Sequence, residues 1–193
     1  WGVRLTYNWA RSWPGMVHED WRYTKLSDDT GPLYWLVSFL GIHLFPTVLV
    51  FLGCIPLYFI FQDPSALGFI DALAVAVTAG AITIEAVADN QLRAFRLAKT
   101  ESSPKIMTTG LWGWSRHPNY FGEIMFWVGI FLFTLPQFMA GEYWIIAGMA
   151  SMIVLFVFIS IPMMEKREMR KEGYDLYKKR VSFLVPLPPK KGK

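Results

Sequence analysis

The sequence is poor in the residues that build disulfides and metal sites. Its single cysteine, Cys54, lies in an apolar run, which excludes a disulfide within the chain and a zinc site made of several cysteines. The three histidines, His18, His43 and His117, are scattered without the spacing of metal ligands. We therefore expect no metal site, and we interpret Cys54 as a small buried hydrophobe.

Charge is also scarce, at 18% of residues against 53% hydrophobic. A soluble domain of this size rarely has so few charges, and the apolar residues occur in long blocks that are typical of membrane helices. The net charge of +4 is not concentrated in a basic helix or a known binding module, so we expect no nucleic-acid partner. The Ser/His/Asp order, HExxH, CxxC and the glycine-rich phosphate loops of soluble enzymes are missing too.

Four apolar blocks predict an all-α, polytopic membrane bundle. About 20 residues cross the hydrocarbon core, and Pro46 and Pro56 predict a kink in the first block. Residues 62–65 predict the turn that follows it. The blocks cover residues 33–61, 67–88, 118–139 and 143–162.

The first 32 residues combine Trp and Tyr with Arg, which is typical of a membrane–water interface. We interpret residues 1–32 as an interfacial segment of one membrane domain that comprises the whole chain. The alternative is that Arg4, Tyr7 and Asn8 line a site completed by residues before Trp1. Because Trp1 falls inside an amphipathic pattern, we expect the chain to be the C-terminal part of a longer protein.

Two basic segments flank the third and fourth blocks. Residues 89–117 carry a net charge of +3 and the tail at residues 165–193 a net charge of +6. A hairpin of two spans places both segments on one side, which the positive-inside rule makes cytoplasmic.

Glu85, Asp89, Arg93 and Arg96 fall within an arc of about 80° on one helix face. An ordinary helix that leaves the bilayer with an Asp89–Arg93 ion pair is one interpretation. We favour a polar cavity instead, because a carboxylate at membrane depth is costly.

The polar residues at this cytoplasmic end favour a large anionic cofactor over a metal. Arg and Lys bind phosphate groups, and the helix that begins at Pro118 directs free N–H groups toward an anion. The candidate cofactor-binding residues are Glu85, Asp89, Arg93, Arg96, Lys105, Ser115, Arg116, His117, Asn119, Tyr120, Glu123, Glu165 and Tyr174.

Three ordered motifs carry a resemblance to a known family. They are GLWGWSRHPNYFGE at residues 110–123, ADNQLRAFR at 88–96 and SIPMMEKREMRKEGYDLYKKRVSFLVPLPPK at 160–190. The chain resembles the C-terminal membrane domain of the steroid 5-alpha-reductase family, most closely its broad, mostly uncharacterised branch. The resemblance implies an oxidoreductase that uses NADPH to reduce a carbon–carbon double bond in a lipophilic substrate within the bilayer.

The resemblance also implies roles for single residues. Asp89, Arg96, Asn119 and Glu123 match cofactor-contacting positions of the family, and Lys105 stands where the steroid reductases have Arg.

Two departures argue against steroid specificity. Glu85 stands where those enzymes have Asn, and Phe126 replaces a Glu. The family's catalytic Glu and Tyr belong to its N-terminal half, and the Tyr position falls at or near Trp1, so we assign no catalytic residue here.

Two alternatives remain open. The RHPNY segment and the basic tail also resemble the isoprenylcysteine carboxyl methyltransferases, which would make the cofactor S-adenosylmethionine. A membrane scaffold without chemistry is the third hypothesis. For each, we expect an integral membrane protein, in the endoplasmic reticulum of a eukaryote or the inner membrane of a bacterium.

Overall fold

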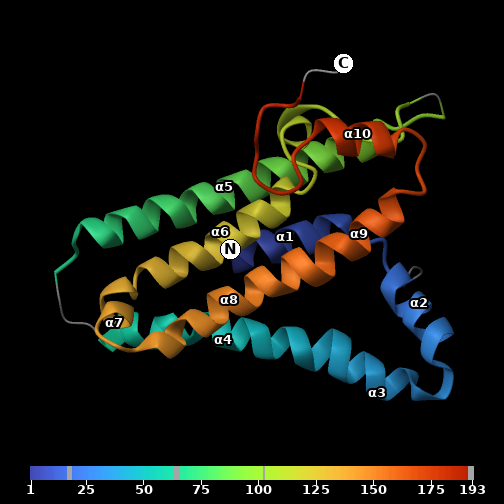
Figure 1. Ribbon diagram of the computed structural model, residues 1–193. Coiled ribbons are helices and arrows are strands. Elements are labelled where there is room, and N and C mark those ends of the chain that lie inside the picture. The colour runs from blue at the N-terminus through green and yellow to red at the C-terminus, as the bar shows by residue number, and fades with distance from the viewer. Residues whose placement is uncertain (17–18, 63–65, 102, 191–193) are drawn as a thin grey trace.

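The computed structural model describes residues 1–16, 19–62, 66–101 and 103–190. His18, most of the predicted turn at residues 62–65 and the last three residues of the predicted tail lie outside this part. The described residues form helices and loops, with one parallel β-bridge between Ser115 and Ser182. The predicted all-α membrane bundle is thereby confirmed, and Figure 1 shows its long helices running side by side.

The helical elements follow one another along the chain with short connections. In order they are α1 (Gly2–Ser12), α2 (Trp21–Thr30), η1 (Gly31–Leu33), α3 (Tyr34–Ser38), η2 (Phe39–Leu44), α4 (Phe45–Gln62), α5 (Phe69–Leu97), η3 (Gly110–Gly113), α6 (Pro118–Leu132), α7 (Leu135–Met139), η4 (Tyr143–Ile145), α8 (Ile146–Val154), η5 (Leu155–Ser160), α9 (Ile161–Glu168) and α10 (Tyr174–Arg180).

The segments η2 and η5 are π-helical, and proline explains both. Each ends two residues before a proline, Pro46 in α4 and Pro162 in α9. A proline within a helix lacks the N–H that would donate to the carbonyl four residues earlier, and its ring collides with that same carbonyl. A wider turn just before the proline removes the collision, so the helix continues with a local change of pitch.

Within the described residues, three helical stretches are long and apolar enough to cross a membrane: Trp21–Gln62, Phe69–Leu97 and Tyr143–Glu168. The predicted third span is shorter than residues 118–139, because α6 ends at Leu132 and α7 follows as a separate turn. Pro136 at the start of α7 ends the longer helix. The 15 residues of α6 rise about 22 Å, less than the ~30 Å of a hydrocarbon core.

Small residues bring α5 and α6 into close contact. Ala74, Ala81 and Ala88 recur every seven residues on α5 and are almost completely buried. Opposite them, Gly122 and Gly129 of α6 lie so close that an added Cβ would collide with the α5 chain. This small-residue interface is typical of helices packed in membranes, and it places Glu85 of α5 directly against α6.

The second interface, between α4 and α8, is built in the same way. A Cβ at Gly148 of α8 would collide with the backbone of Leu52 and Gly53 in α4. Gly53 in turn leaves room for the ring of Trp127. The neighbouring Cys54, expected to be buried, is exposed because it lies on the outer face of this apolar helix.

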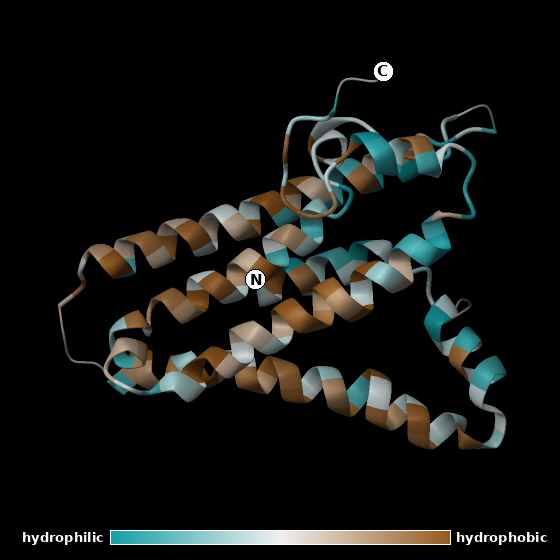
Figure 2. Cartoon of the chain, in the orientation of Figure 1, coloured by the Kyte–Doolittle hydropathy of each residue, from teal (hydrophilic) through white to brown (hydrophobic). Residues whose placement is uncertain are grey.

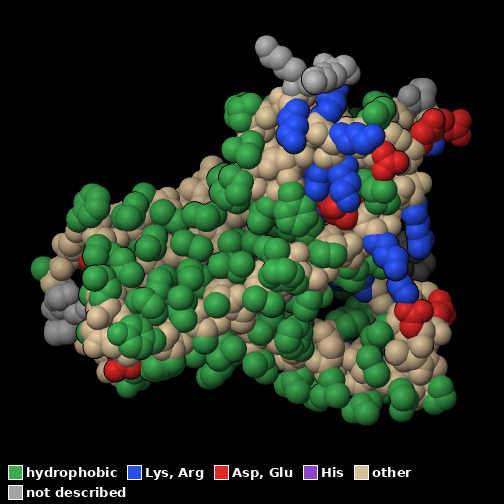
Figure 3. Space-filling model, viewed as in Figure 1, with side chains coloured by type: hydrophobic (Ala, Val, Ile, Leu, Met, Phe, Trp, Pro, Cys, Tyr) green, Lys and Arg blue, Asp and Glu red, His purple; other side chains and the backbone are tan. Residues whose placement is uncertain are grey.

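The outer surface divides into an apolar and a polar part. Hydrophobic residues dominate the long helices, while hydrophilic residues gather around α2, α10 and the end of α9 (Figure 2). Lys and Arg side chains collect at this α10 end, and hydrophobic side chains cover most of the remaining visible face (Figure 3). The two basic segments, which were predicted to share one end of the bundle, do so in Figure 1.

Candidate functional site

The segment that leads into α6 is held in place by the chain's last residues. The backbone N–H of Arg116 donates to the Ser182 carbonyl at 2.9 Å, and the Ser115 hydroxyl donates to the Leu184 carbonyl at 2.6 Å. The N–H of Leu187 donates to the Trp114 carbonyl at 3.1 Å. The described part of the predicted tail is therefore folded: it forms α10 and then packs against the start of α6.

Four side chains from this region form what we call the Arg116 cluster: Arg116, His117, Glu165 and Lys178. Arg116 Nε donates to Glu165 Oε1 at 2.7 Å, and its Nη1 donates to the Lys178 carbonyl at 2.7 Å. Lys178 Nζ lies 3.1 Å from Glu165 Oε2. One buried carboxylate is thus shared by two cations, and the cluster joins α6, α9 and α10.

His117 completes this cluster as a neutral ring. Burial lowers the pKa of His117 to about 4, although Glu165, whose Oε1 lies 3.4 Å from Nε2, acts in the opposite direction. The imidazole stacks on Tyr120, with ring centroids 5.6 Å apart and planes 5° from parallel. Burial also raises the pKa values of Tyr174 and Tyr177, so both phenols stay neutral.

A cavity of about 250 Å³, which we call the cationic cavity, lies next to the Arg116 cluster. Among the described residues, five Lys or Arg line it against one acid, Glu168. The bases are Arg96, Lys99, Lys105, Arg116 and Lys171. Asn119, Tyr120, Tyr174 and the neutral His117 complete the polar part of its wall. The arrangement can hold a multiply charged anion beside aromatic rings and an amide.

Seven of the predicted residues line this one cavity: Arg96, Lys105, Arg116, His117, Asn119, Tyr120 and Tyr174. Ser115 and Glu165 stand behind its wall, where they hold the α6 start and Arg116. Arg93 lines a neighbouring hollow of about 450 Å³, together with Asp89 and Arg96. Arg96 therefore borders both spaces.

The three remaining predicted residues, Glu85, Asp89 and Glu123, lie together elsewhere, around Arg4. We call Arg4 and these three carboxyl groups the Arg4 cluster. Arg4 Nη1 donates to Asp89 Oδ2 at 2.5 Å, and Nη2 lies 2.8 Å from Glu85 Oε2 and 3.5 Å from Glu123 Oε2. Of the residues Asp89, Arg96, Asn119 and Glu123, the cationic cavity contains Arg96 and Asn119, and the neighbouring hollow contains Asp89 and Arg96. Glu123 lines neither of these two spaces.

Helix α1 supplies the remaining partners of this cluster. Trp1 Nε1 donates to both Glu123 oxygens at 3.0 and 3.1 Å, and Asn8 Nδ2 donates to Asp89. The Trp1 ring stacks on Phe126 with centroids 5.2 Å apart. Of the two interpretations of the N-terminal segment, Arg4 and Asn8 fit the one in which they line a site, whereas Tyr7 is largely exposed.

Sequence reasoning missed several of these residues. Lys99, Lys171 and Glu168 line the cavity, but no local sequence pattern indicates that their segments fold over it. Trp1 and Arg11 were also missed, although they recur at helical spacing with Arg4 and Asn8, which the alternative interpretation of the N-terminal segment did include.

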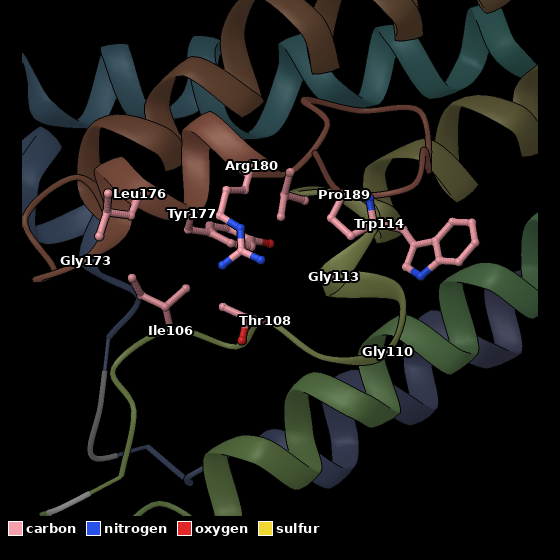
Figure 4. Close-up of a pocket in the computed structure, with 11 residues that line it drawn as sticks. Ile106, Thr108, Gly110, Gly113, Trp114, Gly173, Leu176, Tyr177, Arg180 and Pro189 are labelled. Atoms are coloured by element: carbon pink, nitrogen blue, oxygen red, sulfur yellow. The ribbon is translucent and has the colours of Figure 1, made fainter. Parts of the chain in front are cut away.

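A further hollow of about 420 Å³ lies between residues 106–114 and α10. Figure 4 shows the Arg180 side chain directed into it, with Thr108 and Ile106 across the space and the Trp114 ring at one side. It shares Ile106 and Tyr177 with the cationic cavity, so those two residues separate the two spaces.

Comparisons with known proteins give a family without an assigned activity. The chain is 27% identical over 154 residues to an uncharacterised protein of Schizosaccharomyces pombe, with 69% of this chain and 45% of the yeast protein covered. It therefore spans less than half the length of that curated relative. No solved structure matches it. Since the profile of the family described as "Protein of unknown function (DUF1295)" matches residues 1–181, the chain belongs to that family.

Proposed function

We propose that the cationic cavity binds NADPH and that the protein is a membrane reductase of a carbon–carbon double bond in a lipophilic substrate. The observation that supports this is the five-to-one excess of Lys and Arg over acids around one cavity beside a bundle of apolar helices. When bound, NADPH would supply the hydride of such a reduction.

The residues present fit this cofactor. NADPH carries a diphosphate and a separate ribose phosphate, and Arg96, Lys105 and Lys171 offer charged donors for such groups. Asn119 can pair with an amide, since its side chain both donates and accepts hydrogen bonds. The Tyr120 ring, stacked on neutral His117, offers a flat apolar face.

The positive charge of the cavity lining favours NADPH over S-adenosylmethionine. The sulfonium of S-adenosylmethionine is a cation, and a wall with five bases and one acid would repel it. NADPH brings several negative charges into the same space. The methyltransferase hypothesis therefore ranks second in our proposal.

An apolar cavity supports a lipophilic substrate. It measures about 500 Å³ and lies between η2 and α4 on one side and η5 and α9 on the other. Gly41, Ile42, Leu155 and Ile159 belong to its lining, and Lys25 and Asp29 of α2 stand at its polar edge. Met163 faces this cavity and the next residue, Met164, lines the cationic cavity, so the two spaces flank α9.

The proposal includes a multi-pass topology. Lys and Arg gather at the α10 end, which the positive-inside rule assigns to the cytoplasm. The cationic cavity opens at that end, where soluble NADPH is available.

A binding assay on detergent-solubilised full-length protein tests the proposal. We expect NADPH to bind about tenfold or more tightly than NADH, because the ribose phosphate adds a charge-assisted contact worth about 1.4 kcal/mol or more. Arg96→Gln should weaken NADPH binding about tenfold. Arg170→Gln is the matched control, since Arg170 carries the same charge, is exposed and does not line the cavity.

Other outcomes would contradict the proposal. Binding of S-adenosylmethionine without NADPH would favour the methyltransferase. Binding of neither molecule by stable protein would favour the scaffold.

A further inference from the structure

The Arg4 cluster contains more carboxyl groups than its positive charge can neutralise. One guanidinium faces Glu85, Asp89 and Glu123, with Arg4 from α1 and the carboxyl groups from α5 and α6. Glu85 is fully buried, and the Arg4 and Glu123 side chains are each only 13% exposed. Three ionised carboxylates would leave two uncompensated negative charges inside the bundle, which is energetically expensive.

Two of the three groups are well solvated by hydrogen-bond donors. Glu123 accepts indole N–H groups from Trp1 and from Trp127, the latter at 3.1 Å. Asp89 accepts from Arg4 and Asn8, and it is also the most exposed of the three, at 20%. Hydrogen bonds to carboxylate oxygens stabilise the ionised form, so these two groups can carry the negative charges.

Glu85 differs from both. Neither of its oxygens accepts a hydrogen bond of good geometry from any described residue, although Oε2 lies 2.8 Å from Arg4 Nη2. Its carboxyl group and that of Glu123 face the same nitrogen of Arg4, since Nη2 lies 2.8 Å from Glu85 Oε2 and 3.5 Å from Glu123 Oε2. Two carboxyl groups can form a hydrogen bond only if one of them carries a proton.

We propose that Glu85 is a proton-binding site: it is a neutral carboxylic acid that donates a hydrogen bond to Glu123. The charged and titratable groups that face it are Arg4 from α1, Asp89 from its own helix and Glu123 from α6. With the proton bound, Arg4 faces two carboxylates rather than three.

The surrounding packing fixes this arrangement. The Glu85 side chain lies against Gly122, where a Cβ would collide with it and would come within 3.0 Å of the Ala81 carbonyl oxygen. In this position the Glu85 side chain has no exposed surface. The inference does not depend on whether the cationic cavity binds NADPH, because Glu85 does not line that cavity.

Infrared spectroscopy of the purified full-length protein tests the proposal. A neutral carboxyl group has a carbonyl stretching band that carboxylates lack. We expect this band at neutral pH in the wild-type protein, and its loss in Glu85→Gln. Glu142→Gln is the matched control, because Glu142 is exposed at the opposite end of the bundle and should leave the band unchanged.

Thermal unfolding supplies the second measurement. Glutamine has the shape of a neutral glutamic acid and can still donate to Glu123, so Glu85→Gln should leave the midpoint nearly unchanged. Glu123→Gln should lower the unfolding midpoint clearly, because it replaces an ion that accepts hydrogen bonds from two indole N–H groups.

Equal destabilisation by Glu85→Gln and Glu123→Gln would overturn the proposal. So would the absence of a neutral-carboxyl band in the wild-type protein at neutral pH, a result that does not depend on whether any variant folds.

Discussion

The Arg4 cluster and the Arg116 cluster each centre on one mostly buried arginine, yet they have opposite balances of charge. In the Arg116 cluster one carboxylate, Glu165, serves two cations, and four further bases line the cavity beside it. In the Arg4 cluster one guanidinium serves three carboxyl groups. An excess of bases at the polar end suits an anionic ligand, whereas an excess of acids inside the bundle suits a proton.

The two clusters also differ in what they hold together. Arg116 joins the α6 start to α9 and to the backbone of α10, so it is part of the fold at that end. Arg4 attaches α1, a helix without buried residues of its own, to the face of α5 and α6. The consequences of losing each arginine should therefore differ in extent.

The largest effect is expected for Arg116→Met. The change leaves Glu165 buried without its closest cation and removes the bond to the Lys178 carbonyl, which should destabilise the protein by about 3–5 kcal/mol. Thermal unfolding in detergent measures the loss. Lys178→Met removes the other cation from a half-exposed position and should cost about 1 kcal/mol or less. Equal losses in both variants would contradict a structural role for Arg116.

A smaller effect is expected for Arg4→Met. It should release α1 at a cost of about 2 kcal/mol, because the bundle beneath stays packed through its small residues. Limited proteolysis should then cut within α1 while α5 and α6 stay protected. The control is Arg11→Met, whose partner Asn90 is neutral and exposed. Unchanged protection of α1 in Arg4→Met would show that the ion pairs do not anchor it.

These two clusters also show what the sequence could and could not predict. Glu85, Asp89 and Arg96 share a helix face, and helical periodicity identifies such a face without a structure. Periodicity does not predict which neighbouring helix or cavity each residue of that face contacts in the bundle. The separation of Arg96, which lines the cationic cavity, from Glu85 depends on where α1 lies, and α1 is placed by contacts with residues more than 80 positions away.

The spans show the same limit. Long apolar blocks predicted the three stretches that can cross a membrane, because length and hydropathy are properties of the local sequence. The end of α6 at Leu132 was not predicted, since the apolar run continues past it. The helix ends where Pro136 and the buried Thr134 form a turn, and Thr134 closes that turn by donating to the Phe131 carbonyl at 2.8 Å.

A comparison of Asn119 with Glu123 would sharpen the division between the two clusters. Both match cofactor-contacting positions by resemblance, but only Asn119 lines the cationic cavity. Asn119→Ala should weaken NADPH binding about tenfold, or about 1.4 kcal/mol, with unchanged thermal stability. Glu123→Ala, by contrast, should lower the thermal stability, because Trp1 and Trp127 lose their shared acceptor. If Asn119→Ala left NADPH affinity unchanged, Asn119 would be removed from the proposed site.

The smallest effect concerns His117 and its dependence on pH. Its pKa is about 4 in the folded protein and about 6.5 when unfolded, so between these values the unfolded chain binds the extra proton and stability falls as the pH falls. One pH unit below 6.5 the loss should be about 1 kcal/mol. The thermal unfolding midpoint of His117→Gln should depend less on pH in this window than that of the wild-type protein. An unchanged pH dependence would assign the acid sensitivity to other groups. Because the ring is neutral at physiological pH, it adds no charge to the cationic cavity, whose positive sign then comes from Lys and Arg alone.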